Sequence, residues 1–496
     1  MTAPEIPAPP SVDEIIGLNR LDDVNTTDTG NGKRFVRRFG DIVRYAPETE
    51  LWYVWNGTHW EPDVMGKAFA LTAAVIRDIR DEALAAADEP GEGGGPSPRQ
   101  RLLAHATKTE SESSRRRMLT IAPEDPRILV GADELDSAND IIACPNGTVN
   151  LLTGELRRSR PADLATACTL VPYAEGAKSG ELNRYLDTFV PDPVDQEVLF
   201  ALLGTALRGG NHCRMLPILL GGTTSGKSQL MAAVARMLRG YATAINVSVF
   251  RGNLDDKPRP DLVKAMFTRI AYATEASKVW ELHADQVKRL TGGDSIPYRN
   301  LYAQSVEATP RFTPIIVTNA MPRVKGADEA FKRRMIVFTF EHSLLSKDED
   351  PNVKDRFIRD EKCLSAILAR VVAGARSPLF AQGIKWDLIP AKFVHGTMDS
   401  FEALDNIAEF LQWMVELGHL SVVNLVDTPA VQCAKASDLH GWYTHWVKKH
   451  GDKSDRDAQL SLRDFGVQLR TRGWESAKAA GVRWLGWKLV DSAPWL

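Results

Sequence analysis

Cysteine is scarce in this sequence, and no two cysteines stand close enough to form a Cys-x-x-Cys pair. The 496 residues include five of them: Cys144, Cys168, Cys213, Cys363 and Cys433. This spacing argues against a zinc ribbon and favours buried thiols in a reducing compartment. We therefore expect a cytosolic protein.

Long apolar runs and an excess of basic charge are missing too. No stretch of about 18 apolar residues occurs, and the N-terminus lacks a basic start followed by an apolar core, so we expect neither a membrane span nor a signal peptide. The formal net charge of -3 excludes a globally basic nucleic-acid coat. Any nucleic-acid site must therefore be a local basic surface.

A glycine-rich motif is the most informative feature that is present. Residues 216–228 read LPILLGGTTSGKS, an apolar run that leads directly into Gly-x-x-x-x-Gly-Lys-Ser. Gly221 and Gly226 let the backbone curl so that successive N–H groups point at the phosphates of a nucleotide. Lys227 then neutralises the β- and γ-phosphates, and Ser228 offers a hydroxyl to Mg²⁺. The pattern predicts a phosphate-binding loop.

The flanks of the motif favour the same interpretation. Apolar residues recur at helical spacing from Gln229 to Arg239, and Gly240 is the expected C-cap, so the loop should lie between a strand and a helix. We expect ATP and Mg²⁺ as cofactors. The residues predicted to bind the nucleotide are Gly221, Gly222, Thr223, Thr224, Ser225, Gly226, Lys227, Ser228 and Gln229.

Three later segments supply candidate catalytic groups. An apolar run ends in Glu275, which at the carboxyl end of a parallel strand would bind Mg²⁺ through water and polarise the attacking water. A second run ends in Asn319, a candidate to hold that water or sense the γ-phosphate. Arg333 and Arg334 precede a third run, where an arginine presented to a neighbouring subunit's ATP would stabilise transition-state charge. A solvated acid for Glu275 and a turn cap for Asn319 stay open as alternatives.

The order of these motifs resembles a known family. Residues 288–294 read KRLTGGD, so the chain shows a phosphate loop, an apolar run ending in Glu, Lys-x-Leu-Thr-Gly-Gly-Asp, Thr-Asn-x-x-Pro, and Arg-Arg before a strand ending in Phe. This ordered set resembles a superfamily 3 helicase, and more closely the phage and plasmid primase-helicase branch related to the poxvirus enzyme. The chain departs from the family pattern at one point, because Glu275 is not paired with a second acidic residue. Glu275 must then both bind the metal through water and act as the base, or Ser228 and water must hold the metal.

The resemblance implies a ring, usually a hexamer, with ATP between subunits and single-stranded DNA in the pore. One face of the ATP site would then consist of Lys227, Ser228, Glu275 and Asn319. Arg334, or with less support Arg333, would reach in from the neighbouring subunit. In the segment that would face the pore, the candidate phosphate contacts are Lys288, Arg289 and Arg299.

The resemblance covers most of residues 21–490. The run 27–35, TDTGNGKRF, is similar to the amino-terminal domain of this branch, and aromatic motifs after residue 410 are similar to its winged-helix module. We expect a flexible arm over 1–20, a collar-like domain over 21–180, the ATPase over 181–385 and the winged helix over 386–496. We find no metal-binding aspartate constellation, so primase activity is not expected, and a separate primase or polymerase is a possible partner.

The carboxy-terminal block has its own basic character. From residue 431 onward it holds 11 Lys or Arg against 7 Asp or Glu, a net of 11 - 7 = +4. Residues 461–472 predict a helix with Leu462, Phe465 and Leu469 inward, followed by a wing. The basic residues expected to contact duplex DNA, such as a replication origin, are Arg463, Arg470, Arg472 and Arg483. A solvated helix face over an aromatic core is the alternative.

These observations predict an α/β protein with an AAA+-like P-loop core around a central parallel sheet, an α+β amino-terminal domain and a carboxy-terminal winged helix. The predicted function is that of an ATP-dependent DNA helicase or translocase for replication of a phage, prophage or other mobile element, in the cytosol of a bacterial host. A kinase or helicase loader is the alternative within P-loop enzymes. An ATP-regulated, origin-binding initiator without processive unwinding is the alternative from another class.

Overall fold

The structure is a computed structural model. Its chain divides into two compact units, residues 1–394 and residues 395–496. The structure describes residues 25–90, 94–251, 259–275, 280–298, 306–325, 328–343, 351–381, 383–394, 406–424, 427–450, 460–471 and 474–490. All five cysteines are free thiols with buried side chains. Within the described ranges, no helix combines the length and apolar character needed to cross a membrane.

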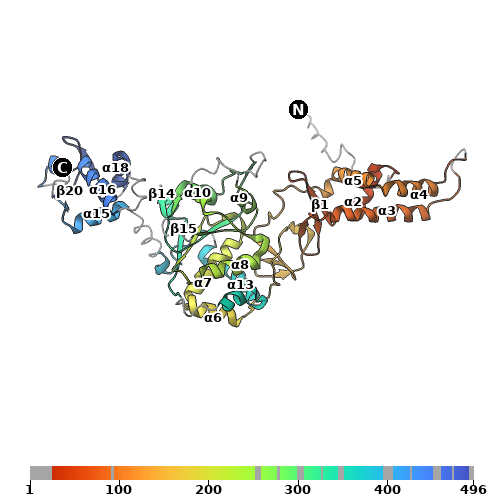
Figure 1. Ribbon diagram of the computed structural model, residues 1–496, viewed down its shortest axis with the longest axis horizontal. Coiled ribbons are helices and arrows are strands. Elements are labelled where there is room, and N and C mark those ends of the chain that lie inside the picture. Colours follow the sequence, from red (N-terminus) through yellow and green to blue (C-terminus); the bar gives the residue numbers. More distant parts are fainter. Residues whose placement is uncertain are drawn as a thin grey trace, which may run out of the picture. The chain divides into compact units, whose positions relative to one another are not determined.

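The first unit begins with a helical layer beside a small sheet (Figure 1). Its helices are α2 (Asp28–Phe39), α3 (Lys67–Ala85), α4 (Pro98–Thr109) and α5 (Glu112–Ile121), and its antiparallel strands are β1 (Val43–Ala46), β2 (Leu51–Trp55) and β3 (Trp60–Pro62). The fully buried Phe35 and Ile79 join α2 and α3. The glycines and prolines of residues 90–100 predict a linker or loop insertion, but α4 begins within this stretch, where Ser97 and Gln100 form a capping box.

A second antiparallel sheet follows, with strands β4 (Ile141–Cys144), β5 (Gly147–Asn150) and β6 (Leu156–Arg157). The expected turns at Asn146-Gly147 and Thr153-Gly154 join these strands. The sequence predicts a helical segment over 181–208, and the structure divides it into two helices, α6 (Gly180–Phe189) and α7 (Pro193–Leu207). Pro191 and Pro193 lack the N–H that a continuous helix needs, and the Asp192 side chain caps α7 by accepting from the Val194 N–H.

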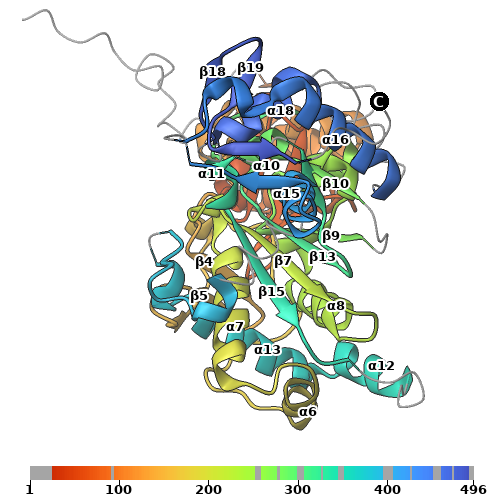
Figure 2. The ribbon, with the colours of Figure 1, turned by 90° about the vertical axis from the view of Figure 1, so that its left-hand side faces the viewer.

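The centre of the first unit is a five-stranded parallel sheet in the order β15-β7-β13-β9-β8. The strands are β7 (Leu216–Gly221), β8 (Ala242–Ala244), β9 (Ile270–Glu275), β13 (Thr313–Thr318) and β15 (Met335–Phe340). The helices around it include α8 (Lys227–Leu238), α9 (Pro260–Ala265), α10 (Ala284–Thr291), α11 (Glu329–Lys332), α12 (Pro351–Arg359) and α13 (Glu361–Gly374). Helices α7, α8 and α13 lie on one side of the sheet and α10 on the other (Figures 1 and 2). The predicted α/β fold class with a central parallel sheet is therefore confirmed.

Two short strand pairs extend from this layer. Strands β10 (Glu281–His283) and β14 (Arg323–Lys325) are parallel, and β11 (Ile296–Tyr298) and β12 (Val306–Ala308) form an antiparallel pair that follows α10.

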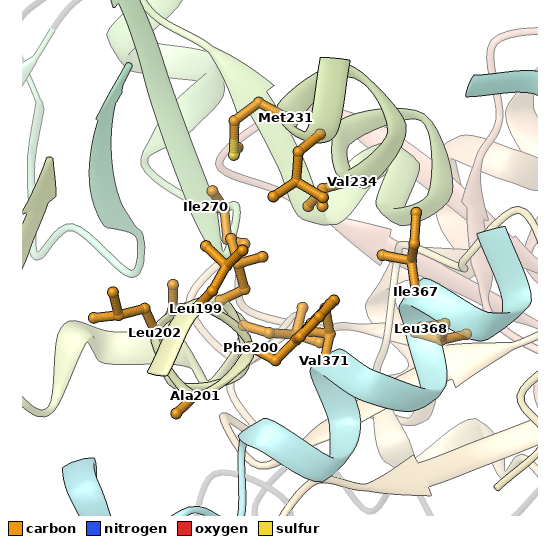
Figure 3. Packing of buried hydrophobic residues seen from close by; sticks show 14 of the residues in the cluster. Leu199, Phe200, Ala201, Leu202, Met231, Val234, Ile270, Ile367, Leu368 and Val371 are labelled. Carbon is orange, nitrogen blue, oxygen red and sulfur yellow. The ribbon is translucent and has the colours of Figure 1, made fainter. Parts of the chain in front are cut away.

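The core of the first unit lies between the sheet and the helices α7, α8 and α13. Helix α7 is apolar on every side, and its last ten residues are all buried, which is the pattern of a central helix. Figure 3 shows side chains that meet there: Leu199, Phe200, Ala201 and Leu202 of α7, Met231 and Val234 of α8, Ile270 of β9, and Ile367, Leu368 and Val371 of α13. This packing fixes α8, and with it the loop that precedes α8, against the sheet.

The second unit is a small α+β assembly. It contains α15 (Asn406–Glu416), β16 (Leu420–Val422), β17 (Ala434–Lys435), α16 (Ala436–His450), α18 (Leu462–Thr471), β18 (Ser476–Lys478), β19 (Val482–Trp484) and β20 (Trp487–Leu489). Strands β18 and β19 form an antiparallel hairpin. Phe465 and Leu469 are fully buried in its aromatic core, as expected, but Leu462 is 46% exposed, because it is the first residue of α18 and precedes the packed face.

Candidate nucleotide site

The predicted phosphate loop joins β7, the neighbour of the central strand β13, to α8. Gly221 is the last residue of β7, and a Cβ there would lie 2.8 Å from the Phe340 carbonyl oxygen. Gly226 has φ +82°, and a Cβ there would lie 2.8 Å from the Phe189 ring. Thr224 has φ +63°. Space thus requires a glycine at both positions, and backbone conformation requires one at Gly226 as well. Such a loop can curl backbone N–H groups inward.

Lys227 occupies the interior of this curl. Its ammonium donates hydrogen bonds to the carbonyl oxygens of Gly221 and Gly222, both at 2.7 Å, and to Ser225 Oγ at 2.8 Å. The residue is 4% exposed, and burial lowers the pKa of its ammonium. Because all three partners are neutral oxygens, a phosphate group would be a stronger acceptor for this cation. The cradle and its buried cation fit the phosphates of a nucleotide.

The other loop residues differ in exposure. Ser225 is buried and donates to the Gly222 carbonyl oxygen at 2.9 Å. Those exposed are Gly222, Thr223, Thr224 and Ser228. Ser228 is the second residue of α8, so its hydroxyl lies at the positive end of the helix dipole beside the loop. The end of α8 differs from the sequence prediction: the helix stops at Leu238, and the C-cap is Arg239, with φ +48°, rather than Gly240.

The strand register brings the other predicted residues to the same edge of the sheet. Thr318 of β13 is level with Leu220 of β7 on one side and with Glu275 of β9 on the other. Asn319 directly follows Thr318, so its backbone lies between the strand that carries the phosphate loop and the strand that ends in Glu275. The carboxyl ends of parallel strands at such an edge form the usual ligand site of an open α/β sheet.

Glu275 has a basic partner that the sequence did not reveal. Its carboxylate lies 3.3 Å from the Arg251 guanidinium, and its side chain is 14% exposed. Arg251 follows a short 3₁₀ turn in the connection between β8 and β9, so no sequence motif marks it. The ion pair thus places a cation beside the Glu275 carboxylate.

The two predicted arginines lie at the opposite edge of the sheet. Arg334 immediately precedes β15, and the parallel register of β15 with β7 places it one strand length, ~20 Å, from Gly221. Its guanidinium donates to the Lys288 carbonyl oxygen at 2.9 Å and to Thr291 Oγ1 at 2.8 Å. Arg333 is exposed. Neither arginine can serve the phosphate loop of its own chain.

The residues predicted to contact DNA have mixed surroundings. The Lys288 ammonium lies 2.8 Å from Asp285 and 3.0 Å from Asp328, so two carboxylates already neutralise it. Arg289 shares α10 with Lys288 and is half-buried. Arg299 falls outside the described residues. The segment is thus less cationic than its sequence suggests.

In the second unit, the predicted helix and wing carry the expected basic residues in different roles. Arg463 and Arg470 are exposed on α18, with the Arg470 guanidinium 5.8 Å from the centre of the Trp484 ring. Arg472 falls outside the described residues. Arg483 donates to the carbonyl oxygens of Ala479 and Cys433, at 3.2 and 3.1 Å, so it ties the β18-β19 hairpin to the rest of the unit.

Comparison with known proteins gives one matching domain family and several viral relatives. Residues 32–191 match the family described as D5 N terminal like. Putative helicase L207/L206 of Acanthamoeba polyphaga mimivirus is 28% identical over 231 residues, 45% of this chain and 24% of that protein. Putative helicase 121R of Invertebrate iridescent virus 3 is 23% identical over 269 residues, 52% of this chain and 28% of that protein. The chain thus spans about a quarter of the length of these relatives.

Among solved structures, the apo A form of the NrS-1 C-terminal region aligns with 92% of this chain and 98% of its own, at 12% identity and a TM-score of 0.46. Residues 32–191 are thus similar to the D5 N-terminal-like family, and the chain shares sequence with viral proteins named as putative helicases.

Proposed function

We propose that this protein is a superfamily 3 DNA helicase or translocase that uses Mg-ATP hydrolysis in the replication of a phage, virus or other mobile element. The observation that carries the proposal is the buried Lys227 ammonium inside a glycine cradle, at the same sheet edge as Asn319 and Glu275. The names of the viral relatives favour a helicase over a small-molecule kinase.

In this proposal each residue has a definite task. The loop N–H groups and Lys227 bind the β- and γ-phosphates, while Ser228 and Glu275 hold Mg²⁺, directly and through water respectively. Bound Mg²⁺ would neutralise charge on the β- and γ-phosphate oxygens. Glu275 orients and deprotonates the attacking water, and Asn319, which lies between the two strands, holds that water or senses the γ-phosphate.

The arginine pair favours a shared site. Because Arg333 and Arg334 lie ~20 Å from the phosphate loop of their own chain, either could stabilise the transition state only at the ATP of a neighbouring subunit. A ring, such as a hexamer around single-stranded DNA, supplies such neighbours at every interface. A dilute monomer that hydrolyses ATP at the full rate would contradict this arrangement.

Strand displacement on a forked DNA substrate tests the proposed function. The wild-type protein with Mg-ATP should separate the strands, and Lys227→Ala should not. DNA-stimulated hydrolysis without displacement would favour the ATP-regulated origin-binding initiator, an alternative that the exposed basic residues of α18 support. Absence of nucleotide binding by the wild-type protein would overturn both.

A further inference from the structure

Helix α6 contacts the phosphate loop from behind, although no motif in α6 marks it as part of a nucleotide site. Three aromatic residues meet at this point: Tyr185 and Phe189 of α6, and Phe357 of α12. The Tyr185 ring stacks on Phe357 with a centroid distance of 4.5 Å and is 5.0 Å from Phe189. The Tyr185 side chain is 4% exposed.

This aromatic group contacts the peptide that links Gly226 to Lys227 in the loop. The Tyr185 hydroxyl donates to the carbonyl oxygen of Gly226 at 3.1 Å, and that oxygen also accepts the first α8 hydrogen bond, from the Leu230 N–H at 3.0 Å. A Cβ at Gly226 would lie 2.8 Å from the Phe189 ring and 3.0 Å from the Tyr185 ring. The rings therefore fill the space behind Gly226, while the hydroxyl holds its carbonyl.

The direction of the next N–H group follows from peptide geometry. The Gly226 carbonyl and the Lys227 N–H belong to the same planar trans peptide and point in opposite directions. Fixing the carbonyl against Tyr185 thus fixes the Lys227 N–H toward the front of the loop, where phosphate binds. Burial raises the pKa of the Tyr185 hydroxyl, so it stays protonated and remains a donor.

We propose that Tyr185 is a positioning residue of the nucleotide site, and that α6 orients the phosphate loop through the Gly226 carbonyl. This inference rests on the proposed function, since it names a further residue of the same site. It also gives the D5 N-terminal-like region a direct connection to the nucleotide, because the match over residues 32–191 includes α6.

Tyr185→Phe is the informative variant, because it removes the hydroxyl and keeps the buried ring. The Gly226 carbonyl retains its bond to Leu230, so the fold should persist. We expect affinity for a fluorescent ATP analogue with Mg²⁺ to fall about fivefold, the effect of one ordinary hydrogen bond. Amide hydrogen exchange over residues 226–228 should become faster, with or without nucleotide.

Tyr241→Phe is a matched control in the same unit. Tyr241 is equally buried, and its hydroxyl accepts from the Ala143 N–H at 2.8 Å and donates to the Ala167 carbonyl at 2.7 Å, with no contact to the loop. Removing two bonds should lower the melting temperature more than Tyr185→Phe does. Nucleotide affinity should nevertheless stay within about twofold of wild type, because Gly226 is untouched.

The outcomes separate the two proposals. Wild-type affinity and wild-type exchange in Tyr185→Phe would overturn the positioning role, as would equal losses of affinity in both variants, since those would follow from general destabilisation. If the wild-type protein bound no nucleotide, the proposed function would fail. Exchange over residues 226–228, compared between the two variants, would still decide whether Tyr185 orders the loop.

Discussion

At the scale of single residues, the chemistry of this site depends on one cation and one carboxylate held by different means. Lys227 is held by neutral loop oxygens, which a phosphate can replace, whereas Glu275 is held by the charged Arg251. Substitutions of Lys227 and Glu275 should therefore have different effects on nucleotide binding and on hydrolysis.

Lys227→Ala should abolish both tight nucleotide binding and hydrolysis, because the loop loses the cation buried in its cradle. Glu275→Gln should bind ATP with nearly wild-type affinity but turn over at least ~10²-fold more slowly, the usual contribution of a general base. Equilibrium binding of a fluorescent nucleotide and steady-state phosphate release, both with DNA present, measure the two effects. Hydrolysis by Glu275→Gln at the wild-type rate would remove Glu275 from the catalytic role.

Residue identity in the loop was predictable, but the partners of those residues were not. The spacing of Gly221, Gly226 and Lys227 is enough to infer a phosphate loop, because glycine fits the close contacts at both glycine positions and the positive φ at Gly226. Arg251 and Tyr185 reach the site from distant parts of the chain. Such contacts depend on tertiary packing, which leaves no local pattern in the sequence.

At the scale of elements, β15 and α10 are joined by Arg334. Its guanidinium binds the Lys288 carbonyl oxygen and the Thr291 hydroxyl at the end of α10, just before the β11-β12 hairpin. The Lys288 ammonium in turn binds Asp328, the N-cap of α11. The turn that carries both arginines is thus tied to the segment that the family resemblance assigns to DNA.

Arg334→Ala should loosen the end of α10, since the Lys288 carbonyl and the Thr291 hydroxyl both lose a donor. We expect faster amide exchange over residues 288–292 in the free protein. Arg333→Ala is the control from the adjacent position, and because Arg333 is exposed it should leave this exchange unchanged. Identical exchange in wild type and Arg334→Ala would show that the two bonds do not stabilise α10.

Element boundaries were predictable where capping or strand chemistry is local, and less so elsewhere. The strands that end at Glu275 and at Thr318 follow from short apolar runs. The helical segment predicted over 181–208 carried no internal boundary, whereas the structure ends α6 at Phe189 and begins α7 at Pro193. Parallel register and strand order, which set the site, arise from long-range pairing that periodicity does not encode.

The second unit offers a test at the same scale. Deleting residues after 394 should leave DNA-independent ATP hydrolysis largely intact, because the phosphate loop, Glu275 and Asn319 all belong to the first unit. If Arg463 and Arg470 bind duplex DNA, duplex affinity should fall, and the slope of log affinity against log salt should decrease by ~0.9 for each lost phosphate contact. Equal duplex affinity of both proteins across a salt series would favour a packing or partner-binding role for this unit.

At the scale of the whole molecule, Arg333 and Arg334 lie too far from the phosphate loop of their own chain to assist hydrolysis there, so a role for either one requires a second subunit. One chain contributes the loop, Glu275 and Asn319 at one edge of its sheet, and Arg333 and Arg334 at the other. A head-to-tail ring pairs these opposite edges at each interface. For Arg334 to act in this way, it must leave its two partners on α10, so its engagement with a neighbour's ATP would also release that helix.

Mixed assemblies test this arrangement most directly. Arg334→Ala should bind nucleotide nearly normally but lose hydrolysis by ~10³-fold or more, as trans-acting arginines do, and Glu275→Gln should also be inactive. Mixing the two creates some interfaces at which an intact Glu275 faces an intact Arg334, so measurable ATPase should return. Arg333→Ala mixed with Glu275→Gln serves as the control. Only the variant of the arginine that acts in trans should be inactive alone and also regain ATPase on mixing, so the comparison identifies that arginine. If the Arg334→Ala loss came only from loosening of α10, co-assembly would restore nothing, and a shared ATP site that uses Arg334 would be excluded.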